Sequence, residues 1–105
     1  MKVGDRVYYV YILRCEKNCL YTGITSDVER RFREHCEGKG AKYTKTHPPL
    51  GVEAVWQSAN KNEAARLEYR IKALTKGEKE SLILDGEKEL TLKVGENVFK
   101  FKRLL

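Results

Sequence analysis

Two β-prone apolar runs near the N-terminus, separated by a short polar break, constrain the fold of this chain most strongly. Residues 7–14 are almost unbroken in apolar and β-prone side chains, which is typical of a strand covered on both faces. Residues 20–24 resume that character after the polar break at residues 16–18. The pattern predicts a β-hairpin with a three-residue loop, whose last residue, Asn18, tolerates the left-handed conformation common at that position.

The length of this loop decides which face of the sheet each side chain occupies. A three-residue loop pairs Leu13 with Tyr21 and Tyr11 with Gly23, which places both tyrosines on one face. A two-residue loop would send Tyr21 to the opposite face. We expect the three-residue loop, and with it two tyrosines that lie together.

A basic helix is expected to follow the hairpin. Ser26 and Glu29 have the spacing of a capping box, and Gly38 supplies a stop at the C-terminal end. At about 100° per residue, Arg31 and His35 lie along one border of the apolar stripe of this helix. Arg31 is therefore the helix arginine best placed to reach across the sheet.

The remaining elements follow from the same kinds of signal. A glycine- and lysine-rich loop at residues 38–45 leads to a third strand over residues 52–59, in which Trp56 belongs to the core. Asn60 caps a second helix, and Glu68 flanks the core face of that helix, so its carboxylate is expected to be partly shielded. A third helix is expected at residues 76–84, and a second hairpin at residues 88–102.

These elements predict an α+β fold: a small three-stranded antiparallel sheet flanked by about three helices, with an added C-terminal β-hairpin. A chain of 105 residues has room for one core only. We therefore expect one unit over residues 1–84 and a hairpin extension over residues 85–105 that packs on the same domain.

Charge is distributed unevenly along the chain, whose formal net charge is +6. Residues 1–77 hold 15 Lys and Arg against 9 Asp and Glu, whereas residues 78–105 hold 6 of each. A positive surface favours polyanions, most often nucleic acid.

No apolar stretch approaches a membrane span, and residues 1–6 do not resemble a secretory signal, so we expect a soluble cytoplasmic protein. Three cysteines are too few and too odd in number for a disulfide framework, and we take them as reduced thiols that bind no metal.

The hairpin motifs Val10-Tyr11-Ile12 and Tyr21-Thr22-Gly23, followed by Arg31, His35 and Glu68, resemble the GIY-YIG nuclease superfamily. The resemblance covers residues 7 to about 84. The runs at residues 38–44 and 68–72 are similar to the small single-domain bacterial group UPF0213, typified by YhbQ and YazA. The chain departs from the superfamily pattern at two scaffold positions, with Val10 in place of Gly and Thr22 in place of Ile.

The resemblance implies a small antiparallel sheet flanked by helices and a metal-dependent DNA endonuclease, with DNA repair or processing as the kind of role that the fold suggests. It implies catalytic roles for five residues: Tyr11, Tyr21, Arg31, His35 and Glu68. Glu68 would hold a single Mg²⁺ or Mn²⁺, which suits a hard oxygen site with one carboxylate. Arg31 would offset charge on the phosphate, and Tyr11 would accept a proton from water if nearby cations lowered its pKa from about 10.

Contacts to DNA are expected from the lysine-rich loop and from the second helix. The candidates are Lys39, Lys42, Tyr43, Lys45 and Lys72, with Tyr43 available for stacking on a base. Taken singly, each candidate has a plain structural explanation, such as a solvated lysine or a tyrosine at the rim of a core.

The alternative functions are a nucleic-acid-binding module without turnover and a protein-interaction module that uses the second hairpin. Relatives that cut at chosen sites add a separate DNA-binding domain, so specificity here would come from DNA shape or from a partner protein, and no oligomer is required.

Overall fold

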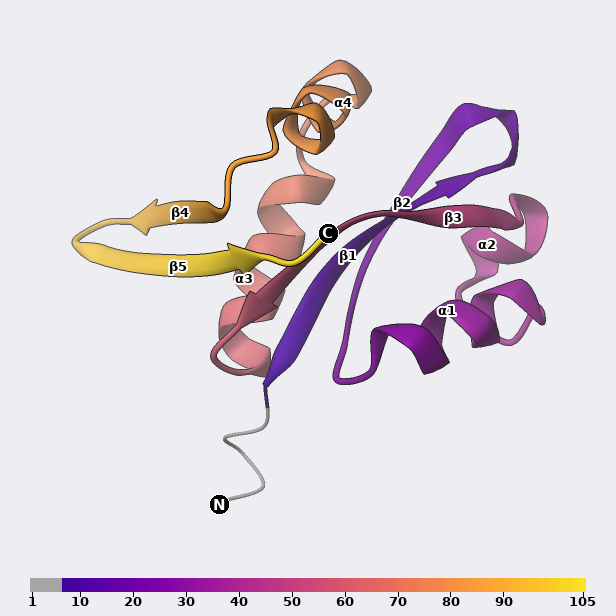
Figure 1. Ribbon diagram of the computed structural model, residues 1–105, viewed down its shortest axis with the longest axis horizontal. Coiled ribbons are helices and arrows are strands. Elements are labelled where there is room, and N and C mark those ends of the chain that lie inside the picture. The colour runs from indigo at the N-terminus through magenta and orange to yellow at the C-terminus, as the bar shows by residue number, and fades with distance from the viewer. Residues whose placement is uncertain (1–6) are drawn as a thin grey trace.

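The computed structural model describes residues 7–105, which form five strands and four α-helices (Figure 1). A short 3-10 turn, η2 (Glu16–Asn18), joins the first two strands. In chain order the other elements are β1 (Tyr8–Cys15), β2 (Cys19–Thr25), α1 (Val28–Cys36), α2 (Lys42–Thr46), β3 (Pro49–Ser58), α3 (Lys61–Lys72), α4 (Lys76–Asp85), β4 (Glu89–Val94) and β5 (Asn97–Arg103). The expectation about a secretory signal concerns residues 1–6, which lie outside the described part of the chain.

All five strands belong to one antiparallel sheet in the order β2-β1-β3-β5-β4. The α+β class is confirmed, but the prediction of a three-stranded sheet with a hairpin added to it is wrong. The second hairpin continues the sheet, because β5 pairs with β3 where Arg103 lies opposite Trp56. Phe101 supplies the physical reason: its fully buried side chain belongs to the same core as Trp56, so it reaches that core only when the hairpin docks on β3.

The first hairpin has the predicted register. Leu13 lies opposite Tyr21 and Tyr11 opposite Gly23, as a three-residue connection requires. Asn18 has a left-handed backbone conformation, with φ 61°, and Lys17 shares it, with φ 63°. Asn adopts this conformation readily and Lys does so at some cost, so the turn rather than residue preference sets the backbone at Lys17.

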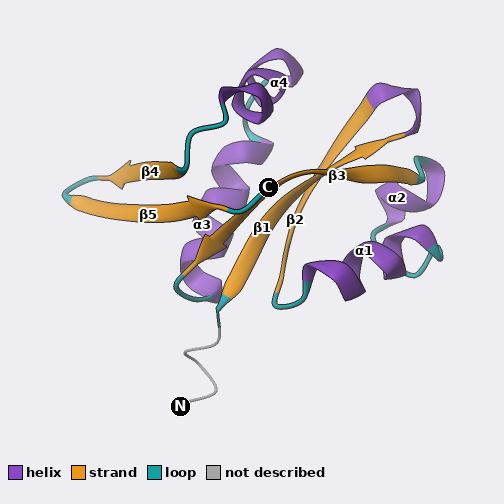
Figure 2. Cartoon of the chain, in the orientation of Figure 1, coloured by secondary structure: helices purple, strands orange, loops and turns teal. Residues whose placement is uncertain are grey.

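Alternate residues of β1 contribute to two hydrophobic clusters, one on each face of the sheet, within the one folded unit. Val10 and Ile12 pack in the core that includes Leu67 and Ile71 of α3. Tyr11 and Leu13 belong to a second cluster, against which Val28 and Phe32 of α1 pack. Figure 2 shows the consequence, with α1 and α2 on one side of the strands and α3 and α4 on the other. Trp56 is 1% exposed in the α3 core, which confirms its predicted place.

The ends of the helices agree with the sequence in two cases and disagree in one. The side chain of Asn60 accepts a hydrogen bond from the backbone N–H of Glu63, so α3 begins as predicted, and α4 begins at Lys76, also as predicted. The predicted cap of α1 at Ser26 is wrong, because Asp27 accepts from Arg30 N–H instead. The Thr25 hydroxyl accepts from the Asp27 N–H, which fixes the exit from β2 and leaves Asp27 as the residue directly before the helix.

Residues 38–49 are more ordered than the predicted loop. They include the five-residue helix α2, and β3 begins at Pro49, three residues before the predicted start. Lysine and threonine do not form an apolar stripe, so periodicity gave no signal for so short a helix. Within residues 7–105, no helix is long and apolar enough to cross a membrane.

Candidate active site

Tyr11 occupies the centre of the face that α1 covers. Its side chain is buried and lies opposite Gly23 of β2. A Cβ at Gly23 would overlap the phenol of Tyr11, so the glycine makes room for the ring. Tyr21 lies on the same face, with the two ring centroids 6.4 Å apart. The hairpin therefore brings together the two tyrosines that the sequence predicted to be neighbours.

His35 is buried beneath these rings and hydrogen bonds at both ring nitrogens. Its Nε2 lies 2.9 Å from the Tyr11 hydroxyl, and its Nδ1 lies 2.8 Å from Oγ1 of Thr44. The Thr44 hydroxyl donates to the carbonyl of Ala41, at 2.9 Å. Having donated its only proton, this hydroxyl must accept from Nδ1–H of His35. The unprotonated nitrogen of a neutral His35 is then Nε2, which accepts from the Tyr11 hydroxyl.

The segment between α1 and β3 supports this chain of hydrogen bonds. Gly40 passes so close to His35 that a Cβ there would overlap the imidazole ring. Thr44 is buried in α2, one residue after Tyr43. The Tyr43 ring stacks on Tyr21, with centroids 5.9 Å apart, and on His47, at 4.5 Å. The lysine-rich loop thus forms one wall of the site.

The environment of the site shifts the pKa of both central groups. Burial, helped by Tyr21 and Glu68, raises the pKa of Tyr11 to about 12, although Arg31 acts in the opposite direction. The condition set for Tyr11 as a direct proton acceptor, a pKa lowered from about 10 by nearby cations, is therefore not met, because burial outweighs the effect of Arg31. Burial also lowers the pKa of His35, and the positive charge of Arg31 adds to that effect. Both shifts favour the neutral pair, a protonated phenol and an imidazole that accepts from it.

The two charged candidates flank the neutral pair. Arg31 lies on α1 and bonds Glu34 one turn later, with Nη1 and Oε1 3.0 Å apart. Glu68 on α3 is 22% exposed, which agrees with the predicted partial shielding, and Lys72 lies 3.4 Å from its carboxylate. The Lys72 ammonium is also 6.0 Å from the centre of the Tyr21 ring. The site therefore combines neutral hydroxyls with one accessible carboxylate and two cations.

The donor set around Glu68 suits one kind of metal ion. Among residues 7–105, no three His, Cys, Asp or Glu side chains form a cluster that would hold a metal. A lone carboxylate fits a hard cation such as Mg²⁺ or Mn²⁺, which keeps several waters and takes other oxygen ligands from a phosphate. All three cysteines are free thiols, and Cys15 is buried. The predicted single divalent metal is compatible with this geometry.

The predicted contacts to DNA divide into two groups. Tyr43 and Lys72 lie beside Tyr21, at the site itself. Lys42 and Lys45 are exposed on α2, and Lys39 precedes that helix and pairs with Glu37 at 3.7 Å. These three lysines contribute positive charge around the site, and among the described residues none of them forms an ion pair with Glu68.

Sequence reasoning missed the residues that hold His35 in place. Thr44 carries the hydrogen bond to Nδ1, and Gly40 allows the close approach of the backbone. The only sequence signal for either residue is the run at residues 38–44, which is rich in glycine and lysine and is similar to the same run in relatives. His47, which stacks on Tyr43, had no signal of its own.

Comparison with known proteins gives the same family at three levels. Residues 7–81 match the model of the GIY-YIG catalytic domain. UPF0213 protein OB0043 of Oceanobacillus iheyensis is 49% identical over 81% of this chain and 99% of its own, and UPF0213 protein YhbQ of Salmonella typhimurium is 46% identical over 76% and 80%. The solution NMR structure of UPF0213 protein BH0048 from Bacillus halodurans aligns with a TM-score of 0.51, at 45% identity, and covers 76% of this chain and 85% of that one. The chain therefore belongs to the GIY-YIG family and, within it, to the UPF0213 group.

Proposed function

We propose that this protein is a DNA endonuclease that hydrolyses phosphodiester bonds with one divalent metal, Mg²⁺ or Mn²⁺, held at Glu68. The observation that carries the proposal is the buried hydrogen-bond chain from Tyr11 through His35 to Thr44, flanked by Arg31 and Glu68. Membership of a family that is defined by a catalytic domain supports it.

The neutral Tyr11–His35 pair suits the transfer of a proton. With a pKa near 12, the Tyr11 phenol is protonated at neutral pH and is a poor acceptor by itself. His35 can take the phenol proton at Nε2 while the phenol oxygen takes a proton from the attacking water. The positive charge then resides on His35, and its Nδ1–H keeps the bond to Thr44. In this scheme Tyr11 relays the proton and His35 is the general base.

Arg31 and Glu68 serve the phosphate. A guanidinium can bind two phosphate oxygens at once and offset the charge that grows on them during attack. Arg31 has to exchange its contact with Glu34, a half-buried neighbour on the same helix, for such a contact. Because both side chains of this pair still reach solvent, the pair contributes little free energy and the exchange costs little. A metal bound at Glu68 would supply Lewis-acid stabilisation of the phosphoryl oxygens and the leaving oxygen.

The surface around the site favours weak and largely electrostatic binding of DNA. Lys72 lies at the site, and the α2 lysines and Lys39 extend the positive surface beyond it. Tyr43 presents an aromatic ring that is 38% exposed, on which an unpaired base can stack. Such contacts are not specific for sequence, so specificity would come from DNA shape or from a partner protein.

Incubation with a panel of DNA structures tests the proposal. Supercoiled, branched and single-stranded DNA would each be incubated with wild type and with Glu68→Ala, with Mn²⁺, with Mg²⁺ and with a chelator. We expect cleavage by wild type only when metal is present, and a loss of roughly a hundredfold or more in Glu68→Ala. Glu87→Ala, which removes an exposed carboxylate from the loop before β4, is the matched control and should cleave like wild type.

Two outcomes would contradict the proposal. If wild type cleaves none of these DNAs with either metal, yet binds them with a salt dependence that Glu68→Ala retains, the protein is a binding module without turnover. If it neither cleaves nor binds DNA at low salt, a function on DNA is excluded.

A further inference from the structure

The strand β4 is an edge of the sheet. It pairs with β5 along its whole length, from Glu89 to Val94, and it is the last strand in the order β2-β1-β3-β5-β4. Figure 1 shows the hairpin of β4 and β5 extending away from the rest of the sheet, with no strand of the described residues beyond β4. An edge of this kind offers a row of backbone donors and acceptors to another strand.

The ladder between β4 and β5 fixes which backbone groups face outward. The N–H of Arg103 donates to the carbonyl of Lys88, at 2.8 Å, so these residues form a hydrogen-bonded pair. Such pairs alternate along an antiparallel ladder, which directs the N–H and C=O groups of Leu90 and Leu92 toward β5. The groups of Glu89, Thr91 and Lys93 then face the open edge.

These three residues are complementary to a second copy of themselves. Antiparallel pairing about a twofold axis at Thr91 places Glu89 opposite Lys93 of the other strand, and Lys93 opposite Glu89. The outward backbone groups of all three residues then meet their equivalents in the correct register. Opposite charges directly across two strands are stabilising, whereas like charges there are destabilising. Among residues 7–105 of the single chain, Glu89 has only a distant and exposed charged partner, Lys100, at 4.0 Å.

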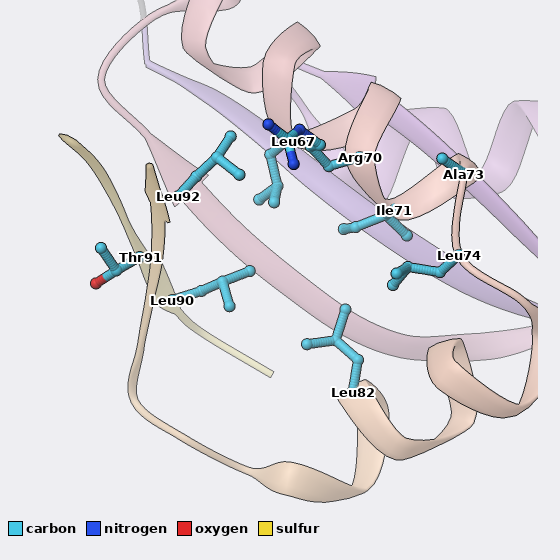
Figure 3. Close-up of a pocket in the computed structure, with 9 residues that line it drawn as sticks. All are labelled: Leu67, Arg70, Ile71, Ala73, Leu74, Leu82, Leu90, Thr91 and Leu92. Atoms are coloured by element: carbon cyan, nitrogen blue, oxygen red, sulfur yellow. The ribbon is translucent and has the colours of Figure 1, made fainter. Parts of the chain in front are cut away.

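The face of β4 that is turned toward α3 is apolar and lies over a pocket. Leu90 and Leu92 point toward α3, whereas Thr91 points away from it, as Figure 3 shows. With Leu67 and other residues of α3, the segment that follows α3, and Leu82 of α4, they line a pocket of about 350 Å³. In the twofold arrangement Leu90 lies opposite Leu92 of the second strand, so the apolar surface of one copy continues into the other.

We propose that β4 is a self-association surface, on which two copies of this chain pair antiparallel about Thr91 to form one continuous sheet. The β4–β5 hairpin lies beyond residues 7–81, the part that matches the family domain, so this surface is an addition to that domain. Six residues of edge strand bury far less surface than the roughly 800 Å² per partner of a stable interface, so the dimer is weak. The proposal does not depend on nuclease activity.

Sedimentation equilibrium of charge variants tests the pairing. Wild type should show a dimer whose fraction rises with protein concentration. Glu89→Lys sets two positive charges against each other across the twofold axis and should be monomeric, and Lys93→Glu should be monomeric for the same reason with the signs reversed. An equimolar mixture of these two variants should form a one-to-one dimer, because each supplies the charges that the other lacks. The double variant E89K/K93E should regain self-association.

A backbone variant separates edge pairing from charge. Thr91→Pro removes one outward N–H, which an edge strand tolerates because that group makes no bond within the chain. It should give a folded monomer, as judged by circular dichroism. If wild type stays monomeric at the highest attainable concentration, the proposal is overturned. It is equally overturned if both single charge variants still dimerise and their mixture has no larger dimer fraction than either variant alone. This second outcome is decisive even if Thr91→Pro does not fold.

Discussion

The hairpin of β1 and β2 and the hairpin of β4 and β5 lie at opposite ends of one sheet, and they bury very different side chains. In the first hairpin, Tyr11, Thr22 and Thr25 are buried polar residues among apolar neighbours. In the second hairpin, Phe101 is the only buried residue, and both strands otherwise alternate between exposed and half-buried positions.

This difference shows which contacts hold each hairpin against the rest of the molecule. A buried hydroxyl or imidazole requires a partner in a fixed geometry, so the first hairpin depends on Gly23, His35 and Thr44 together. The second hairpin is joined to the molecule by a short ladder with β3, by the buried ring of Phe101 and by half-buried apolar side chains that pack against the same core. It should therefore be most sensitive at Phe101 and tolerant at its exposed positions.

The largest effect is expected at Phe101. Phe101→Ala should lower the free energy of unfolding by about 3–5 kcal/mol, because it empties a fully buried aromatic site next to Trp56. Val98→Ala, on the same strand and 54% exposed, should change it by less than about 0.5 kcal/mol. Urea denaturation measures both. Similar losses in the two variants would show that the hairpin is held by its whole length.

In the first hairpin the corresponding test is at a glycine. Gly23→Ala forces a Cβ against the Tyr11 phenol and should cost about 1–3 kcal/mol of stability, with a loss of any DNA cleavage. Gly51→Ala is the matched control, since it lies in β3 and its Cβ would meet no atom within 4 Å. The contrast is contradicted if Gly51→Ala destabilises the protein as much as Gly23→Ala.

The first hairpin could be predicted in detail because its signals are local. Loop length fixed the pairing of Tyr11 with Gly23, and the register followed from strand geometry. Helical spacing placed Arg31 and His35 on one border of α1, and Glu68 beside the core face of α3. These residues lie around the same site in the structure, although their chemical roles stay predictions.

Features that depend on tertiary contacts escaped prediction. The five-stranded sheet requires Phe101 to find the core beside Trp56, which no local pattern in residues 88–102 reveals. The raised pKa of Tyr11 comes from burial, and burial is set by α1 and α2 packing over the ring. Thr44 bonds a ring that lies nine residues away in the sequence, so its role appears only once α2 is in place.

A smaller effect is expected where Thr44 meets His35. Thr44→Val leaves Nδ1–H of His35 without an acceptor and should cost about 1–2 kcal/mol. The ring can relieve this loss by moving its proton to Nε2. This nitrogen would then donate to the Tyr11 hydroxyl and could no longer accept the phenol proton, which blocks the proposed proton path. Nitrogen-15 NMR of His35 should therefore show a protonated Nδ1 in wild type and in Thr44→Ser, and a protonated Nε2 in Thr44→Val. A protonated Nε2 in wild type would contradict the assigned tautomer.

The smallest effect is a dependence of stability on pH that arises from His35 of α1, which hydrogen bonds to Tyr11 of the first hairpin. The pKa of His35 is lowered by burial from the ordinary value of 6.5, so below that pH the unfolded chain binds a proton that the folded chain does not. Stability should therefore fall as the pH drops below 6.5, by at most about 1.4 kcal/mol per pH unit, until the folded pKa is reached. Thermal denaturation between about pH 5 and pH 7 measures this slope.

Two variants assign that slope to the buried imidazole. His35→Gln should remove it, and His47→Gln should retain it, because His47 makes no contact with the Tyr11 hydroxyl in the hydrogen-bond chain described above. The Arg14–Glu80 pair, which joins β1 to α4, acts mainly below this range of pH. Arg14 lowers the pKa of Glu80 from 4.5 to about 2, so the contribution of this pair to stability is lost between these two values. β4 and β5 contain no histidine. A slope that survives His35→Gln would therefore mean that the acid sensitivity arises neither from the imidazole that bonds Tyr11 nor from a histidine of the second hairpin.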